Sequence, residues 1–268
     1  MASSFLQQFC TSLRDWWREQ AREQGTRRAT FLVLSGLCDF LRESTPERRR
    51  RRYGDMEYDW ENRVNTTSGT VGWRARLLGV FHSPYQPTEP SLFREMMANL
   101  PIALDQLTFE QFTFEHFTFE RFTFIDLGSG KGRTLLLASE YPFKKIVGVE
   151  LIAELHRAAE ENIRAYRSAT QRCSRVEAVC ADACEFRFPA EPLVLYLFNP
   201  LPESGMRRLI ARLEKTLAEN PRKVYVLYHN PLHERVIAES PVFARIGGTE
   251  QYSVYSAGYS ADSAREAG

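Results

Sequence analysis

The fold of this chain is decided by residues 122–133, which read FTFIDLGSGKGR. The apolar run at residues 122–127 has the length and the β-branched and aromatic content of a buried parallel strand, and a glycine-rich turn follows it directly. A helix is predicted at residues 133–141, because leucines and an alanine fill it and Pro142 ends it. Residues 145–151 read as a second strand. This order predicts a parallel α/β sheet.

The spacing of the glycines in this turn argues against two classes of nucleotide site. A backbone that turns sharply and approaches a ligand closely cannot carry Cβ atoms, and Gly128, Gly130 and Gly132 meet that need. A dinucleotide fingerprint has its last glycine where this chain has Arg133. A phosphate-binding P-loop has Ser or Thr directly after its lysine, and here Gly132 follows Lys131. Nicotinamide, flavin and ATP sites are therefore disfavoured.

Acidic residues follow the next two strands, where a nucleoside would be recognised. Glu150 comes at the end of the second strand, where a carboxylate can accept hydrogen bonds from both hydroxyls of a ribose. A third strand, at residues 176–180, is followed by Asp182, at the edge where an adenine amino group could be bound. Asp182 has a second interpretation of equal weight, a solvated loop or a helix cap.

After the third strand the chain continues to alternate strands and helices, and it closes with an antiparallel hairpin. The hairpin brings the number of strands to seven, whereas a dinucleotide-binding fold would continue in parallel. The predicted elements are a strand at residues 192–198, a helix at 203–218, a strand at 222–228, a helix at 233–240, and two strands around 243–246 and 252–256 joined through Gly247 and Gly248.

Together, the glycine turn and the acids around it resemble the class I methyltransferases that use S-adenosylmethionine (SAM). The resemblance implies an α/β fold, a Rossmann-like sheet of seven strands with helices on both faces, here with an N-terminal helical extension. It also implies SAM as the cofactor and S-adenosylhomocysteine as its product. The turn would hold the methionine part, and the acids after the second and third strands would hold ribose and adenine. The implied cofactor-binding residues are Thr88, Asp126, Gly128, Ser129, Gly130, Gly132, Arg133, Glu150 and Asp182.

The carboxyl ends of the fourth and fifth strands are the expected place of the methyl acceptor. The pair Asn199-Pro200 resembles the Asn/Asp-Pro-Pro-aromatic motif of amino methyltransferases, in which oxygens accept the N–H bonds of the substrate. Leu201 and Pro202 replace the second proline and the aromatic residue, which argues against planar nitrogen substrates. His229 is a candidate base or a structural histidine. The catalytic candidates are Asn199, Pro200, His229 and Tyr85.

A segment before the first strand extends the resemblance. Residues 85–88 (YQPT) and a predicted helix at 92–100 look like methyltransferases whose pre-strand loop folds over SAM. With residues 65–69 (NTTSG), they make the region 58–255 resemble a group of largely uncharacterised bacterial methyltransferases. The Tyr-x-Pro-Thr pattern is also similar to that of some lysine methyltransferases. The implied activity is methyl transfer (EC 2.1.1 type) to an unidentified acceptor, either a protein amine of lysine type or a small-molecule nitrogen.

Two alternatives belong to other classes of function. One is a catalytically silent SAM-binding or scaffold protein, which would keep the cofactor residues without turnover. The other is a nicotinamide-dependent oxidoreductase, which would bind NAD and ignore SAM.

A five-residue repeat precedes the first strand and reads LTFEQ, FTFEH, FTFER and FTFID over residues 107–126. A period of five matches neither a helix nor a strand, so we interpret it as a tandem expansion and an aggregation hazard. The predicted organisation is a helical N-terminal extension with an Arg-rich linker at residues 1–57, a pre-core segment at 58–106, the repeat insertion at 107–121, the methyltransferase core at 122–258 and a disordered tail at 259–268.

Composition limits the partners. With 268 residues, 43% of them hydrophobic, the chain can bury one full α/β core, and its net charge of +1 gives no general attraction to nucleic acid or membrane. The arginine run at residues 48–52 is interpreted as a solvated linker, with RNA or an acidic protein as the alternative partner. Residues 4–23 and 30–41 predict amphipathic helices packed on the core, with peripheral membrane contact as the alternative.

The compartment and the metal content follow from what the sequence lacks. No transmembrane segment and no secretory signal are predicted, so a cytoplasmic location is expected. The 5 cysteines are odd in number and lack paired C-x-x-C spacing, which indicates neither a disulfide framework nor a zinc site. Methyl transfer from a sulfonium needs no metal.

Overall fold

The protein is built around one sheet of seven strands, in the order β3-β2-β1-β4-β5-β7-β6. We analysed a computed structural model, which describes residues 2–43, 56–67, 86–102 and 118–258. All neighbouring strands from β3 to β5 pair in parallel, and β7 pairs antiparallel with both β5 and β6. The strands are β1 Thr123–Leu127, β2 Lys145–Glu150, β3 Val176–Cys180, β4 Leu193–Phe198, β5 Val224–His229, β6 Ala244–Gly248 and β7 Tyr252–Ala257. The predicted α/β sheet of seven strands, closed by an antiparallel hairpin, is confirmed.

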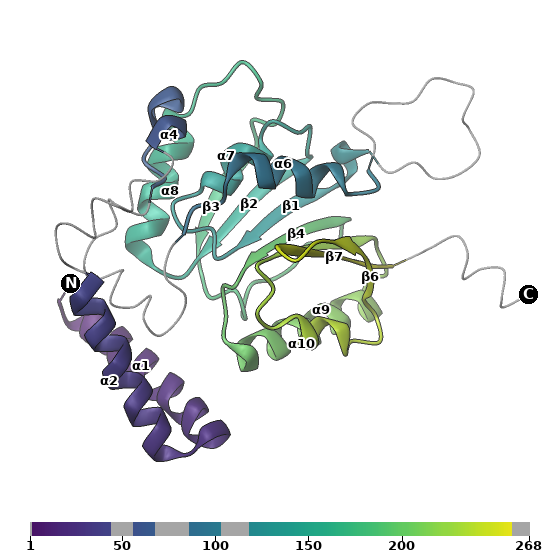
Figure 1. Ribbon diagram of the computed structural model, residues 1–268. Helices are drawn as coiled ribbons and strands as arrows, with labels where there is room; N and C mark the ends of the chain where they lie inside the picture. The colour runs from purple at the N-terminus through teal and green to yellow at the C-terminus, as the bar shows by residue number, and fades with distance from the viewer. Residues whose placement is uncertain (1, 44–55, 68–85, 103–117, 259–268) are drawn as a thin grey trace, which may run out of the picture.

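Helices cover both faces of this sheet (Figure 1). On one face lie α6 and α7, and α9 and α10 lie on the other; Phe93 and Leu135 belong to the first apolar core and Leu209 and Ile237 to the second. The buried strands β1, β2, β4, β5 and β7 supply alternate residues to the two cores, as their two-residue period requires. The helices of the core are α4 Met56–Asn62, α6 Pro90–Ala98, α7 Arg133–Ala138, α8 Ala153–Ala165, α9 Glu203–Glu219 and α10 Glu234–Ala238.

Several predicted boundaries differ from the structure, and two of the differences have a clear physical cause. Helix α7 ends at Ala138, three residues before the predicted end, and the Ser139 hydroxyl donates to the Leu136 carbonyl there. Gly247 and Gly248 lie inside β6 and not in the turn of the hairpin. Gly248 has φ +123°, and a Cβ at that position would lie 2.4 Å from the Tyr252 carbonyl oxygen, so the glycine serves a close approach between the two strands.

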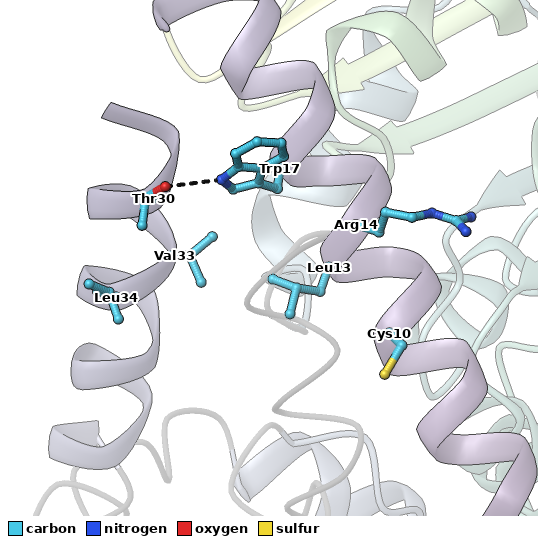
Figure 2. A pocket seen from close by; sticks show the side chains of 7 residues that line it. All are labelled: Cys10, Leu13, Arg14, Trp17, Thr30, Val33 and Leu34. Carbon is cyan, nitrogen blue, oxygen red and sulfur yellow. Dashed lines mark hydrogen bonds between the residues drawn. The ribbon is translucent and has the colours of Figure 1, made fainter. Parts of the chain in front are cut away.

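The N-terminal helices form a hairpin of their own. α1 (Ala2–Gln24) and α2 (Thr26–Glu43) meet at Gly25, whose φ of +86° ends the first helix. Trp17 Nε1 donates to Thr30 Oγ1 at 3.2 Å beside an apolar pocket between the two helices (Figure 2). Figure 1 shows the hairpin covering neither face of the sheet, contrary to the predicted packing on the core. None of the helices in the described residues could cross a membrane.

The end of the pentad repeat belongs to the core. Phe119–Arg121 form a short 3₁₀ turn, and the buried Phe119 ring lies 5.0 Å from the Phe143 ring and 5.4 Å from that of Tyr141. The predicted insertion at residues 107–121 therefore ends in a packed turn. Its residues 107–117, the arginine run at 48–52 and the tail at 259–268 lie outside the described residues.

Candidate functional site

The glycine turn, residues 128–132, leads from β1 to α7 at the carboxyl edge of the sheet. The amides of Gly128 and Ser129 both donate to the Val149 carbonyl, at 2.8 and 3.1 Å, and this ties the turn to β2. Gly128, Gly130 and Gly132 have φ of +87°, +54° and +84°. All three lie in the left-handed region, which a side chain disfavours. The backbone conformation therefore favours glycine at all three positions, as the sequence predicts.

Gly128 is also the point where the glycine turn touches the loop that follows β4. A Cβ on Gly128 would lie 2.7 Å from Pro200 Cβ, so only glycine fits between the turn and the end of β4. The predicted catalytic residue Pro200 and the predicted cofactor turn therefore lie in direct contact.

Glu150 holds the turn from the end of β2. Its Oε2 accepts a hydrogen bond from Gly130 N at 2.8 Å, and its Oε1 accepts one from Ile152 N at 2.7 Å. Burial raises the pKa of this carboxyl, and the backbone N–H groups partly oppose the rise. Each carboxylate oxygen has a second lone pair, so the group can accept further hydrogen bonds from a ligand.

Asp126 lies beneath the turn in a dry environment. It is 2% exposed, and burial raises its pKa well above the usual range, with the Glu150 charge adding to the rise and a hydrogen bond from Thr134 opposing it. Two carboxyls so placed disfavour each other's ionisation. Asp126 is thus shielded from solvent by the turn that it underlies.

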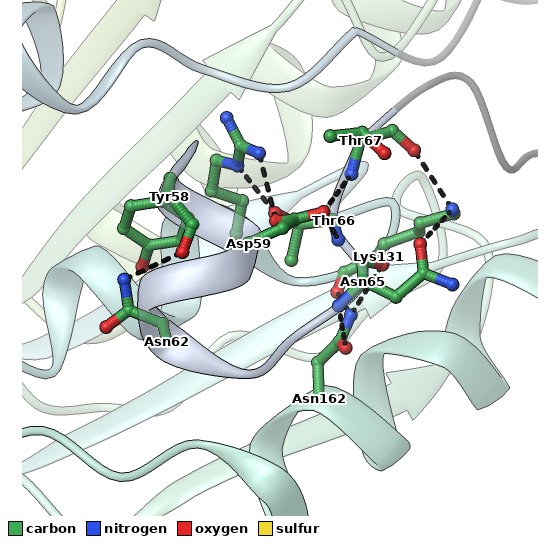
Figure 3. A network of polar contacts seen from close by, with 9 residues as sticks. Tyr58, Asp59, Asn62, Asn65, Thr66, Thr67, Lys131 and Asn162 are labelled. Atoms are coloured by element: carbon green, nitrogen blue, oxygen red, sulfur yellow. Dashed lines mark hydrogen bonds and ion pairs between the residues drawn. The ribbon is translucent and has the colours of Figure 1, made fainter. Parts of the chain in front are cut away.

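A strap, residues 58–67, lies across the start of α7 (Figure 3). Asp59 Oδ2 accepts hydrogen bonds from Thr66 N at 2.7 Å and Thr67 N at 2.9 Å, and its Oδ1 accepts one from the Thr66 hydroxyl. Arg133 Nη2 forms an ion pair with Asp59 Oδ1 at 3.1 Å, and Arg133 Nε donates to Thr66 Oγ1 at 2.6 Å. The guanidinium also lies 4.8 Å from the centre of the Tyr58 ring. The strap is therefore fixed by a buried charge pair.

Lys131 and Asn162 attach the other end of the strap. Lys131 Nζ donates to Asn65 Oδ1 at 3.1 Å and to the Thr67 carbonyl at 3.0 Å. Asn162 Nδ2 on α8 donates to the carbonyls of Asn65 and Lys131, and its Oδ1 accepts from Asn65 N at 2.7 Å. Burial lowers the pKa of Lys131 to about 8. One asparagine thus joins the strap to the glycine turn.

The remaining predicted cofactor residues lie at different places around this edge. Ser129 Oγ is buried next to Gly148 of β2, and it has no hydrogen-bond partner among the residues that the structure describes. Asp182 is exposed, and its Oδ1 accepts from Cys184 N at 2.8 Å, so it caps its own turn as in the second interpretation above. Thr88 is buried and bonds to Tyr196, while Tyr85 lies outside the described residues.

Asn199 joins the loops that follow β4 and β5. Its Nδ2 donates to the Asn230 carbonyl at 2.6 Å, and its Oδ1 accepts from Leu232 N at 3.3 Å. Asn199 and Asn230 both have positive φ, +45° and +47°, which asparagine tolerates better than most residues. The side-chain amide predicted to face a substrate is thus bonded to the neighbouring loop.

His229 lies at the end of β5, inside a buried polar chain. Its Nδ1 is 2.8 Å from the Tyr196 hydroxyl, which is 2.7 Å from Thr88 Oγ1. The Phe198 ring stacks on the imidazole, with centroids 3.8 Å apart and planes inclined by 28°. Burial lowers the pKa of His229 to about 4, so the ring is neutral at pH 7.

Sequence reasoning missed Asp59, Asn162 and Tyr196. Asp59 and Asn162 carry no pattern of their own, since Arg133, which pairs with Asp59, and Asn65, which bonds to Asn162, are distant in the chain. Tyr196 looks like a core residue within an apolar strand. In the part of the chain that the structure describes, no cluster of three or more His, Cys, Asp or Glu side chains could hold a metal ion.

Comparisons with known proteins give likenesses of fold. No protein-family model and no curated protein sequence matches this chain. The chain is similar to an RNA methyltransferase from Salinibacter ruber in complex with S-adenosyl-L-homocysteine, at 18% identity over 64% of this chain and 92% of that one, with a TM-score of 0.40. It is also similar to a ribosomal protein L11 methylase from Lactobacillus delbrueckii subsp. bulgaricus, at 17% identity over 52% and 70% of the two chains, with a TM-score of 0.37.

A third similar structure is a predicted N6-adenine-specific DNA methylase from Listeria monocytogenes. The identity is 14% over 64% of this chain and 51% of that one, and the TM-score is 0.42. At these identities the likeness is one of fold, and the chemistry rests on the chain's own residues.

Proposed function

We propose that this chain is a SAM-dependent methyltransferase that transfers a methyl group to a nitrogen acceptor. The observation that carries the proposal is the unit formed by the glycine turn and Glu150. Three left-handed glycines lie beside a buried carboxylate that bonds to Gly130 N, at the carboxyl ends of β1 and β2. Strand order reverses at β1, between β2 and β4, which is where open α/β sheets bind their ligands.

The residues present fit the cofactor. Glu150 has lone pairs to accept the two hydroxyls of the ribose, and the left-handed turn leaves room for backbone to approach the methionine part. Arg133 is occupied by Asp59 and Thr66, so its proposed part is to hold the strap against the turn. Asp182 remains a proposal for the adenine contact.

The chemistry asked of the chain is mainly alignment. SAM supplies an electrophilic methyl group, and its transfer is an in-line displacement in which the protein orients the nucleophile and excludes water. Asn199, Pro200 and His229 are the proposed acceptor residues, next to the turn through the contact of Pro200 with Gly128. The acceptor is proposed to be a protein amine or a small-molecule nitrogen.

Calorimetric titration tests the cofactor. We expect S-adenosylhomocysteine to bind in the micromolar range and NAD not to bind. Glu150→Ala should abolish binding of S-adenosylhomocysteine, because it removes the ribose contact and the support of Gly130 N. The matched control is Glu177→Ala, since Glu177 is an exposed glutamate of the neighbouring strand β3 that forms a surface ion pair with Lys145. Equal affinity in wild type and Glu150→Ala would contradict the proposal.

A catalytically silent protein would pass that titration, so a second experiment separates the two. Wild-type protein is incubated with methyl-labelled SAM and a bacterial lysate, and label is followed in protein and small-molecule fractions. The enzyme is expected to label a fraction that Glu150→Ala leaves unlabelled. Binding of S-adenosylhomocysteine with no labelled fraction would favour the silent alternative.

A further inference from the structure

The buried chain of Thr88, Tyr196 and His229 can be hydrogen-bonded in two directions. In one, the Thr88 hydroxyl donates to Tyr196, and Tyr196 donates to Nδ1 of His229. In the other, an Nδ1–H donates to Tyr196, and Tyr196 donates to Thr88. The distances, 2.7 Å and 2.8 Å, suit both. The direction decides which nitrogen of the imidazole carries its proton.

Counting donors selects the first direction. Thr88 is 2% exposed, and across residues 2–43, 56–67, 86–102 and 118–258 its hydroxyl has no hydrogen bond other than the one to Tyr196. In the second direction Tyr196 would use Thr88 as acceptor, and the Thr88 proton would be buried without an acceptor, which is unfavourable. In the first direction both hydroxyl protons have acceptors. Nδ1 is then unprotonated, and Nε2 carries the hydrogen.

The Nε2 end of the ring is the end left for a ligand. Within the described residues Nε2 has no hydrogen-bond partner. The atom is not fully buried, so it reaches the surface of the site. The stacked Phe198 ring fixes the imidazole plane. Phe198 directly precedes Asn199 and Pro200, and Pro200 touches the glycine turn. His229 therefore lies at the proposed acceptor position.

We propose that Thr88 and Tyr196 hold His229 as the Nε2–H tautomer, so that His229 offers the methyl acceptor a hydrogen-bond donor and not a base. The identity of the ligand as a methyl acceptor rests on the proposed function, whereas the tautomer of His229 does not depend on it. Thr88 and Tyr196 are positioning residues, because they act through the imidazole.

The proposal narrows the class of acceptor. An Nε2–H donor matches a nucleophile that has an unprotonated oxygen or ring nitrogen close to the reacting atom, such as an amide or a heteroaromatic amine. It therefore favours the small-molecule nitrogen of the proposed function over a lysine-type amine, and it favours the planar nitrogens that Leu201 and Pro202 argue against in the sequence. The low pKa of His229, about 4, agrees with this role, since such a group cannot take a proton from an alkylammonium at neutral pH. The acceptor then arrives uncharged, the methyl group leaves the sulfonium as the C–S bond breaks to give S-adenosylhomocysteine, and the proton of the methylated nitrogen is released to water and not to the histidine.

Nitrogen NMR of the imidazole rings in the full chain tests the tautomer. The chain has 5 histidines, and the signals of His229 are assigned by their loss in His229→Gln. In wild type we expect one protonated nitrogen, Nε2, and a strongly downfield, unprotonated Nδ1. Tyr196→Phe removes the hydrogen-bond partner of Nδ1. Thr88→Val removes the hydroxyl that donates to Tyr196, so the Tyr196 hydroxyl can either donate to Nδ1 or accept from it. Each should convert the single tautomer into a mixture.

Tyr225→Phe is the matched control, because Tyr225 is a buried tyrosine of β5 with no hydrogen bond to His229 within the described residues, and its loss should leave the tautomer unchanged. An Nδ1–H tautomer in wild type, or a single Nε2–H tautomer in both Tyr196→Phe and Thr88→Val, would overturn the proposal. If Tyr196→Phe does not fold, Thr88→Val decides the question.

Titration with S-adenosylhomocysteine tests the location of His229. The ring signals of His229 should shift on binding, since His229 lies at the same edge as the glycine turn. Binding that leaves these signals unmoved would overturn the assignment to the acceptor position. Failure of the ligand to bind at all, with the tautomer as expected, would instead count against the proposed function.

Discussion

The two halves of the candidate site are built from different kinds of contact. The cofactor half contains the glycine turn, Glu150 and the strap, and it is held by a buried ion pair and a buried lysine. The acceptor half contains Asn199, Tyr196 and His229, and its contacts are hydrogen bonds between neutral groups. A charged framework suits a charged cofactor that must be fixed in place. A neutral, aromatic framework suits an acceptor that must lose its water shell.

The largest expected effect comes from breaking the charge pair of the cofactor half. Arg133→Met leaves Asp59 buried without its cation, so we expect a loss of about 3–5 kcal/mol in the free energy of unfolding. Urea denaturation measures this. Arg207→Ala, which removes an exposed arginine on α9, should change the midpoint little. Equal stability of the two variants would show that the strap does not depend on its ion pair.

A smaller effect is expected where the two halves touch. Gly128→Ala forces a side chain into left-handed backbone and against Pro200, which should cost about 2–4 kcal/mol of stability. Affinity for S-adenosylhomocysteine should fall with it in calorimetry. Gly247→Ala is the control, because its Cβ meets nothing within 4 Å. If both variants behaved alike, the contact of Gly128 with Pro200 would not matter.

Substitutions in the acceptor half should lower the free energy of unfolding by a smaller amount. Asn199→Gly keeps the positive φ but loses two hydrogen bonds, at a cost of about 1–2 kcal/mol, and Asn199→Ala should lose roughly 1 kcal/mol more because of the strained backbone. Urea denaturation compares the two variants with wild type. Binding of S-adenosylhomocysteine should persist in both, and its loss in Asn199→Gly would place Asn199 in the cofactor half.

The smallest effect concerns pH. Lys131 has a pKa of about 8 in the folded protein and an ordinary value of 10.5, so between these values the unfolded chain binds more protons. Stability from this group therefore rises with pH, by at most about 1.4 kcal/mol from pH 8.5 to 9.5. Wild type and Lys131→Met, unfolded by urea at both pH values, should differ by this rise.

Urea unfolding of His229→Gln at the same two pH values gives the corresponding measurement for the acceptor half. His229 has a pKa of about 4, so its charge does not change at this pH, and this variant should run parallel to wild type. A parallel course for Lys131→Met as well would remove the distinction between the two halves.

The sheet and the glycine turn could be predicted because their signals are local. Residues 122–133 contain the strand, the turn and the helix start in one stretch, and Glu150 ends the next strand. The prediction of Arg133 as a cofactor residue stays a prediction, since its recorded partners are Asp59 and Thr66 of the strap. No periodicity in the sequence indicates a pairing between residues 74 positions apart.

Residues with a double use were harder to predict. Tyr196 fills the apolar core and also carries the hydroxyl that binds His229. Gly247 and Gly248 have the composition of a turn, but both pair with β7, and Gly248 closely approaches the Tyr252 carbonyl oxygen. In each case a tertiary contact overrides what the local sequence favours.

The strap has a consequence for the order of folding. It joins residues 58–67 to Lys131, Arg133 and Asn162 across 64 to 97 positions of the chain, so closing it costs loop entropy that the local strand-helix units do not bear. We expect the sheet to assemble before the strap is seated. A cofactor that binds only when the strap is in place would stabilise that conformation. The backbone amides of the strap should therefore gain the most hydrogen-exchange protection when the cofactor binds.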